Sequence, residues 1–375
     1  MMTAHGKLTA QHSATAFGPA SGPPKPRDFA VSPLLVFYEV TQACDLVCTH
    51  CRACAQPSPH QHELTTEQSL RLIDQLAEFP TPPTLVLTGG DPLKRRDIYE
   101  LIEHAVWLGM PVAITPSATP LVTPAAIERL VRVGVSRLAI SIDGADAATH
   151  DATRGVAGSF DRSLRILADA NASGISTQVN TTLTPALFPH IERLADLLSE
   201  LEIDMWSVFF LVPVGRALHA PRLTADQCET AFARLWVQSK RQPYVIKTTE
   251  APHYRRFMIQ HRNPSFPLPG GGPPAFTSLN VNDGKGVMFI SHRGAIHPSG
   301  FLPLHCGTYP NDHVVRVYQQ SPIFRALRDP DQLEGKCRRC EFRKVCGGSR
   351  GRAFATSGNP LAEEPDCAYL PKSAL

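Results

Sequence analysis

The sequence predicts an α/β fold whose parallel strands form an open sheet or a barrel, followed by a small loop-rich C-terminal region. Six short apolar, β-branched runs alternate with six stretches of helical periodicity, and a dense group of cysteines directly follows the first run. Strand–helix units in series give parallel strands joined by right-handed crossovers. The chemistry of such folds lies beyond the carboxyl ends of the strands, which is where the cysteine loop is expected.

The alternation can be followed along the chain. Expected strands cover residues 35–40, 84–88, 111–116, 137–143, 176–183 and 205–212. Expected helices cover residues 65–79, 97–109, 124–134, 159–174, 188–201 and 225–240. Thr65 favours a helix start, Pro124 suits a first helical turn, and glycines favour three helix ends, at Gly109, Gly134 and Gly174.

Four segments follow from this pattern. Residues 1–28 lack periodicity and are expected to be a flexible tail, and residues 29–242 form the strand–helix domain. Residues 243–286 connect the domains through a strand at 244–249 and a Pro/Gly-rich loop from 262 onward. Residues 287–375 form the loop-rich domain, which begins with an expected hairpin at 287–291 and 295–297.

Composition narrows the class of protein. The 375 residues are 43% hydrophobic and 19% charged, which is typical of a soluble globular chain. A net charge of +3 without a basic run argues against a nucleic-acid partner. No window offers the ~18 consecutive apolar residues of a membrane helix. The N-terminus also lacks the apolar core of a secretory signal, so we expect a cytoplasmic protein.

The cysteines are unevenly placed. Four of the ten lie within residues 44–54 and four within 337–367, whereas Cys228 and Cys306 stand alone. Clustered cysteines in a large chain without a signal peptide indicate metal ligands in preference to disulfides. Cys228 lies in a helical stretch and suits a small buried hydrophobe.

The first cysteine group can hold an iron–sulfur cluster with an open position. Cys44, Cys48 and Cys51 can bind three irons of a 4Fe–4S cluster and leave the fourth iron without a protein thiolate. Spacing alone leaves two alternatives open. One is a zinc site with His50 or Cys54 as fourth ligand, and the other is a ferredoxin-type run through Cys48, Cys51 and Cys54. The position after the first strand favours the open cluster.

Together with Thr88-Gly89-Gly90-Asp91-Pro92 after the second strand, this cysteine loop resembles the radical S-adenosylmethionine (radical SAM) enzymes. The resemblance implies a partial (β/α)6 TIM-type barrel, a 4Fe–4S cluster on the three cysteines and S-adenosylmethionine at the open iron. Gly89 and Gly90 would let the backbone approach the cofactor, and Asp91 would accept a hydrogen bond from its methionyl amine. The family usually has an aromatic residue before the third cysteine and a glutamate after the two glycines, whereas this chain has His50 and Asp91 at these positions.

Later strand ends extend the resemblance. Ser141, in Ser141-Ile142-Asp143-Gly144, would contact the ribose or the methionyl end of the cofactor, and Arg154 could pair with its carboxylate. Ser117 and Asn180 are further candidates for cofactor contacts at the third and fifth strands. An equally good interpretation of Asn180 is a polar strand residue with its hydrogen bonds satisfied.

The second cysteine group comprises Cys337, Cys340, Cys346 and Cys367. Four cysteines can form a structural zinc site. The segment from residue 346 to 353 resembles instead a SPASM-type (or twitch-like) C-terminal extension, which implies one auxiliary 4Fe–4S cluster with all four irons ligated. Cys306 could be a buried thiol, a substrate contact or an occasional ligand.

The segments at residues 48–53, 210–216, 251–256 and 346–353 resemble the branch of the family that modifies tetrapyrrole side chains. This resemblance implies oxidative decarboxylation or removal of a propionate. Such a reaction needs an external one-electron donor such as flavodoxin or ferredoxin. Guanidinium and ammonium groups could hold the substrate carboxylates, and the candidates are Arg216, Lys247, Arg255 and Arg256. For each arginine the alternative is a solvated surface charge.

Two other functions remain open at this point. One is a maturase that oxidises or crosslinks a ribosomally made peptide, although residues 1–33 are too short and polar for the peptide-binding region that such maturases often carry. The other is a non-catalytic iron–sulfur or zinc-binding protein, which would not cleave the cofactor.

Overall fold

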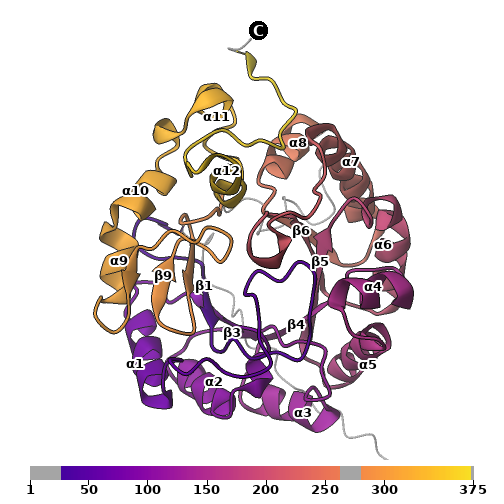
Figure 1. Cartoon of the computed structure of the whole chain (residues 1–375), viewed down its shortest axis with the longest axis vertical. Helices are drawn as coiled ribbons and strands as arrows, with labels where there is room; N and C mark the ends of the chain where they lie inside the picture. The colour runs from indigo at the N-terminus through magenta and orange to yellow at the C-terminus, as the bar shows by residue number, and fades with distance from the viewer. Residues whose placement is uncertain (1–26, 262–279, 373–375) are drawn as a thin grey trace, which may run out of the picture.

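The computed structural model describes residues 27–261 and 280–372 (Figure 1). Most of the expected tail and the greater part of the Pro/Gly-rich loop therefore lie outside the described residues.

Parallel strands alternate with helices to form a partial TIM-type barrel, as predicted. The strands are β1 (Leu35–Glu39), β2 (Thr84–Thr88), β3 (Val112–Ile114), β4 (Arg137–Ser141), β5 (Ser176–Leu183), β6 (Met205–Phe210) and β7 (Val245–Thr249). The helices are α1 (Thr66–Ala77), α2 (Ile98–Trp107), α3 (Pro124–Arg132), α4 (Ala147–Arg154), α5 (Ser159–Ala172), α6 (Ile191–Glu200), α7 (Ala225–Arg241) and α8 (His253–His261). Figure 1 shows these helices as an outer ring around the strands.

Local chemistry explains why these elements form. Thr65 and Gln68 make a capping box that starts α1, and Leu72 and Leu76 bury the inner face of this helix. Strand β5 alternates strictly between half-buried and buried residues. Its buried set packs into the main core beneath the helices, whereas Asn180 from the other set lines the cavity described below.

The structure departs from the expected elements in several places, and helices α4 and α8 and those of the C-terminal part were not expected. Helix α4 was not predicted, so two helices connect β4 to β5. This helix has mostly polar residues and a single buried side chain, His150, which gives little apolar periodicity to detect. Strand β3 is three residues long, shorter than the predicted run.

The C-terminal part adds to the barrel sheet. Strand β8 (Val287–Ile290) pairs with β1 in parallel, Leu35 lying opposite Val287. Strands β9 (Ala295–His297) and β10 (Gly307–Thr308) then continue the same sheet in antiparallel order. The expected hairpin is therefore present, and the sheet runs across the boundary predicted at residue 286. The remaining helices are α9 (Val314–Gln320), α10 (Pro322–Arg328), α11 (Gly335–Arg339) and α12 (Arg350–Ser357).

Among the described residues, no helix has the length and apolar character needed to cross a membrane.

Candidate active site

The three cysteines of the first group meet at one cavity. The loop that leaves β1 carries Cys44, Cys48 and Cys51, and all three line a cavity at the carboxyl ends of the strands. Cys44 and Cys48 are buried and Cys51 is half-buried. Cys54, by contrast, is exposed and does not line this cavity. Three thiols that line one cavity could bind three irons of a 4Fe–4S cluster and leave the fourth iron without a protein ligand.

Several groups already stabilise sulfur at this site. The backbone N–H of Leu46 donates to Cys44 Sγ at 3.4 Å, and Cys44 Sγ is hydrogen-bonded to Ser117 Oγ at 3.3 Å. Arg154 Nη1 donates to Cys48 Sγ at 3.6 Å. The donors from Leu46 and Arg154 favour the thiolates that bind metal, whereas burial raises the pKa of Cys44.

The two glycines after β2 allow close packing against the start of the cysteine loop. A Cβ atom at Gly89 would lie 2.4 Å from the carbonyl oxygen of Thr41, and one at Gly90 would lie 2.3 Å from that of Ala43. The backbones are hydrogen-bonded there, since Gly90 N donates to Thr41 O at 2.9 Å. The glycines line the cavity, but their steric role is to hold the cysteine loop.

The carboxylate of Asp91 is hydrogen-bonded within the protein. It accepts from Leu93 N at 3.1 Å and from Thr119 Oγ1 at 2.7 Å, is fully buried and does not line the cavity. Burial raises the pKa of Asp91, although the Thr119 hydroxyl opposes this shift. Asp91 thus caps the turn after the glycines, and its contact with a methionyl amine stays a prediction.

The other predicted cofactor contacts gather around the same cavity. Four of them line its wall: Ser117, Ser141, Arg154 and Asn180. Ser117 follows β3, Ser141 ends β4, Arg154 ends α4, and Asn180 lies within β5 opposite Ser141. Ser117 Oγ also donates to the carbonyl oxygen of Gly90 at 2.9 Å, and Asn180 Oδ1 accepts from Gln178 Nε2 at 2.6 Å. Their contacts with the cofactor stay a prediction.

A buried ionic group supports one side of the cavity. Arg154 forms an ion pair with Asp143, and His50 Nε2 lies 3.4 Å from the same carboxylate. Burial alone would raise the pKa of Asp143, but Arg154 and His50 outweigh it and the pKa falls. Burial lowers the pKa of His150 to about 4, and Arg154 adds to that shift, so this neighbouring ring is neutral.

Arg216 holds the cysteine loop. Its Nη1 donates to Cys48 O at 3.1 Å, its Nη2 donates to Ala55 O, and its backbone N–H donates to Cys51 O at 3.0 Å. Gly215 precedes it with φ of 59°, a conformation that favours glycine. Arg216 does not line the cavity, so its guanidinium acts on the loop backbone in place of the expected substrate carboxylate.

The remaining candidates for substrate carboxylates lie away from this cavity. Lys247 is on β7, level with Ser207 of β6, and burial lowers its pKa to about 8 with a contribution from Arg137. Arg255 donates to the carbonyl oxygens of Val345 and Val281. Arg256 pairs with Glu229 on α7 and faces the second cysteine group.

An apolar side of the cavity was missed by the sequence reasoning. Phe209, Leu211 and Val212 come from the end of β6, and Phe301 comes from the loop after β9. The rings of Phe209 and Phe301 lie 6.1 Å apart at a tilt of 52°. No local pattern joins residues so far apart in the chain.

Arg52 also lines the cavity and was not predicted to do so. It pairs with Glu39 at 2.7 Å, and its guanidinium lies 4.6 Å from the ring centre of Phe289. His292 Nδ1 contacts the other oxygen of Glu39 at 2.6 Å. Arg52 therefore presents a positive charge beside the apolar side.

The second cysteine group forms its own small cavity. Cys337, Cys340, Cys346 and Cys367 all line it. Two sulfurs accept backbone hydrogen bonds, Cys346 Sγ from Gly348 N at 3.4 Å and Cys337 Sγ from Glu364 N at 3.3 Å. Burial raises the pKa of Cys346 to about 12 and that of Cys367 to about 11. Cys337 is buried and the other three are half-buried, and four thiols around one space fit the donor set of a cluster with all four irons ligated.

Two further observations bear on metal binding. Cys306 does not line this cavity, and its Sγ contacts Leu304 O at 3.5 Å. Within residues 27–261 and 280–372, no three His, Cys, Asp or Glu side chains are grouped so as to hold a single metal ion.

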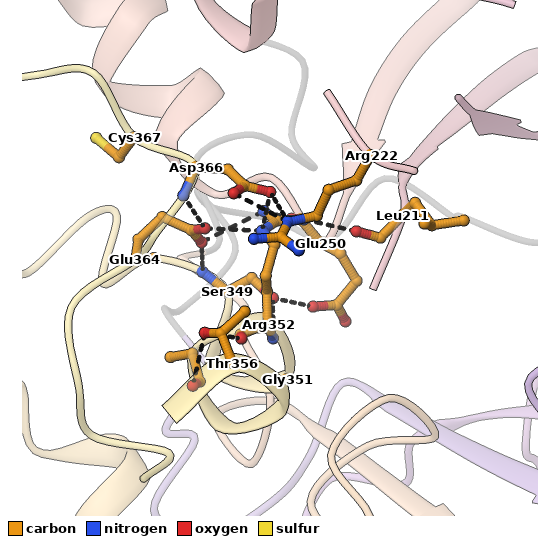
Figure 2. A network of polar contacts seen from close by, with 12 residues as sticks. Leu211, Arg222, Glu250, Ser349, Gly351, Arg352, Thr356, Glu364, Asp366 and Cys367 are labelled. Atoms are coloured by element: carbon orange, nitrogen blue, oxygen red, sulfur yellow. Dashed lines mark hydrogen bonds and ion pairs between the residues drawn. The ribbon is translucent and has the colours of Figure 1, made fainter. Parts of the chain in front are cut away.

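A polar network ties the second cysteine group to the barrel (Figure 2). Arg352 on α12 donates to Leu211 O at 3.1 Å and to Glu250 O at 2.6 Å, and pairs with Glu364 at 2.7 Å. Arg222 pairs with the neighbouring carboxylate of Asp366 at 2.9 Å. Because Leu211 lines the first cavity, this network spans the distance between the two sites.

Comparison with known proteins agrees with this geometry. The profile of the Radical SAM superfamily matches residues 38–198. The chain is 38% identical over 343 residues to the AdoMet-dependent heme synthase of Oleidesulfovibrio alaskensis, covering 90% of this chain and 88% of that protein. It is 28% identical over 372 residues to the Fe-coproporphyrin III synthase of Methanosarcina barkeri, covering 91% of this chain and 89% of that protein.

A solved structure shares the fold. SuiB of Streptococcus suis, bound to its precursor peptide SuiA, superposes with a TM-score of 0.72 at 18% identity, covering 90% of this chain and 76% of that chain. The three cysteines at the strand ends, the barrel around them and the similarity along nine-tenths of the sequence lead to one conclusion. The chain belongs to the radical SAM superfamily and is an enzyme of that type.

Proposed function

We propose that this radical SAM enzyme removes hydrogen from the propionate side chains of a tetrapyrrole and converts them by oxidative decarboxylation. The observation that carries the proposal is the meeting of three thiols with an aromatic wall in one cavity. The names of the two relatives described above, each similar over most of its length, support a tetrapyrrole substrate.

The residues of the first cavity fit the cofactors of the family. Cys44, Cys48 and Cys51 would hold the 4Fe–4S cluster, and Ser117 and Asn180 offer polar contacts for S-adenosylmethionine. When bound, these cofactors supply the one-electron cleavage that yields methionine and the 5′-deoxyadenosyl radical. The protein contributes position, since Arg216 fixes the loop, and exclusion of water, since the thiols are buried.

The cavity has a side suited to a flat, apolar ring system. Phe209 and Phe301 offer aromatic faces for stacking against a macrocycle, and Leu211 adds apolar surface. Among the described residues that line the cavity, the arginines are Arg52 and Arg154. Both are ion-paired, Arg154 with Asp143 and Arg52 with Glu39. Arg154 lies beside the cysteines, whereas Arg52 lies over the ring of Phe289 next to the apolar side, and is therefore the better placed to meet a propionate carboxylate.

The reaction balances if one electron acceptor is available in addition to the adenosyl radical. Loss of one hydrogen atom to the adenosyl radical, of carbon dioxide and of one further electron converts a propionate into a vinyl group. Cys337, Cys340, Cys346 and Cys367 would hold an auxiliary 4Fe–4S cluster that takes up this electron. A flavodoxin or ferredoxin would supply the electron for cofactor cleavage, and the enzyme would work in the cytoplasm.

The first experiment tests cofactor cleavage. Anaerobically reconstituted, reduced protein mixed with S-adenosylmethionine should release 5′-deoxyadenosine, and Cys48→Ala should abolish this release. Cys54→Ala is the matched control, because this exposed thiol lies on the same loop away from the cavity. If Cys54→Ala also removed the cluster spectrum of the first site, the ferredoxin-type ligation would be correct instead.

The second experiment tests the substrate. Iron-coproporphyrin incubated with the active enzyme should lose one carbon dioxide and two hydrogen atoms from each converted side chain, as mass spectrometry would show. Release of 5′-deoxyadenosine without any change in the porphyrin would refute the tetrapyrrole assignment and leave the peptide maturase as the alternative.

A further inference from the structure

His253 is buried without a hydrogen-bond partner. It is the first residue of α8, its exposed fraction is 0%, and neither Nδ1 nor Nε2 has a partner in the described structure. Burial of an unsatisfied polar atom costs about 1–3 kcal/mol. An imidazole with both nitrogens unsatisfied therefore indicates a group that the polypeptide itself does not supply.

The second cysteine cavity is where that group would lie. His253 lines this cavity together with all four cysteines. An imidazole carries an N–H donor whether it is neutral or protonated. Three cationic side chains, Lys336, Arg256 and Arg343, line the same cavity together with the carboxylate of Glu364, so the lining brings an excess of positive charge to four thiolates.

Ligand counting decides how His253 would interact. Four thiolates satisfy the four irons of a 4Fe–4S cluster, so no iron remains for a histidine nitrogen. The sulfur atoms of such a cluster remain hydrogen-bond acceptors, and donors to them are a recognised means of setting the reduction potential. The imidazole of His253 has an N–H group that can donate such a hydrogen bond.

We propose that His253 donates an N–H···S hydrogen bond to the cluster held by Cys337, Cys340, Cys346 and Cys367, and thereby raises its reduction potential. The inference rests on the proposed auxiliary cluster. The hydrogen bond stabilises the reduced cluster more than the oxidised one, because reduction adds negative charge to the sulfur atoms.

Aromatic packing holds the ring in place for this role. The imidazole meets the ring of Phe232 edge-on, with centroids 4.7 Å apart, and lies 6.4 Å from the ring of Phe210. Phe210 in turn lines the first cavity. His253 therefore stands between the substrate site and the second cysteine group, where a change in potential would govern electron uptake from the substrate.

The test uses the full chain carrying Cys44→Ala, Cys48→Ala and Cys51→Ala, so that the signal of the second cluster is seen alone. With isotopically labelled histidine, pulsed EPR of the reduced cluster should show weak coupling to a histidine nitrogen. In this background His253→Leu should abolish the coupling and lower the midpoint potential. His253→Gln, which retains an N–H donor, should restore part of the potential. Phe257→Leu, which removes a buried ring from the same helix, is the packing control and should retain the coupling.

Each outcome decides the proposal. The proposal is overturned if the parent protein shows no histidine coupling, or if the parent and His253→Leu have equal midpoint potentials. Coupling as strong as that of a directly ligated nitrogen would also overturn it, because the histidine would then coordinate iron. If His253→Leu fails to fold, the coupling in the parent protein still decides. Iron analysis of the wild-type chain separates the two failures: about eight irons without coupling refutes only the role of His253, whereas about four refutes the second cluster as well.

Discussion

Replacing Arg352 with methionine should destabilise the contact between the barrel and the second cysteine group. Arg352 and Glu364 are each 1% exposed, and the arginine also donates to the carbonyl oxygens of Leu211 and Glu250 (Figure 2). Methionine fills a similar volume but leaves the carboxylate of Glu364 buried without its cation. The carbonyl oxygens lose their donors as well.

The size of the effect follows from Glu364. Burial alone would raise the pKa of this carboxyl, but Arg352 outweighs burial and lowers the pKa from 4.5 to about 2. That difference corresponds to about 3 kcal/mol of stabilisation at neutral pH. Breaking a buried ion pair by removing one partner costs about 3–5 kcal/mol in measured cases. We therefore expect Arg352→Met to lower the free energy of unfolding by about 3–5 kcal/mol.

Urea unfolding of the anaerobically reconstituted protein, followed by tryptophan fluorescence, would measure this loss. Arg193→Met is the matched control, because Arg193 pairs with Asp146 and the two side chains are 60% and 38% exposed, so the change should cost about 1 kcal/mol or less. The pH dependence gives an independent check. Wild-type protein keeps the contribution of Glu364 above pH 4.5 and loses it as the pH falls towards 2.

In Arg352→Met the pKa of the unpaired, buried Glu364 should instead lie above its ordinary value. The stability of the variant should then increase as the pH falls from 7 to 5, since protonation removes the buried charge. A loss of less than about 1 kcal/mol, the size expected of an exposed pair, would refute the reasoning, as would a pH profile parallel to that of the wild type.

Three other predictions concern the first site and the barrel interior. Gly90→Ala would bring a Cβ atom to 2.3 Å from the carbonyl oxygen of Ala43, so the first cluster should be lost and the second retained. Iron analysis measures this loss. Equal iron content in the variant and the wild type would contradict the steric argument. Arg216→Leu should speed the loss of iron from the first site to a chelator while leaving the KM for iron-coproporphyrin unchanged, whereas a raised KM would restore the substrate role. The buried Lys247 has its pKa lowered to about 8 from 10.5, so unfolding free energy should rise between pH 8 and 10.5, and Lys247→Met should remove that rise; a rise unaffected by the substitution would point to another group.

The features that could be predicted from the sequence are those that depend on the local pattern of apolar and polar residues. Alternating periodicities located the strands, and strand ends meet at one edge of a parallel sheet, where Ser117, Ser141 and Asn180 line the cavity beside the cysteines. Side-chain contacts could not be predicted in the same way. Asp91 follows the two glycines, but its carboxylate is bonded to Thr119 and Leu93 N and does not line the cavity.

Contacts between segments far apart in the chain could not be predicted from local sequence patterns either. The cations proposed for substrate were chosen for charge, yet Arg216 is taken up by loop carbonyls and Arg256 by Glu229. Phe301 reaches the cavity because the C-terminal strands join the sheet beside β1. Pairing between β8 and β1 leaves no periodicity in either strand that could reveal the partner.

That pairing has a consequence for how the enzyme is made. Strand β1, which ends just before the cysteine loop, is hydrogen-bonded by β2 on one edge and by β8 on the other. During synthesis the ribosome releases the cysteine loop early, whereas β8 emerges only after the whole ring of helices. Until then β1 is an edge strand with an open row of backbone groups. We therefore expect iron to be inserted stably only into finished chains, and nascent chains that end before β8 to depend on a chaperone to shield that edge.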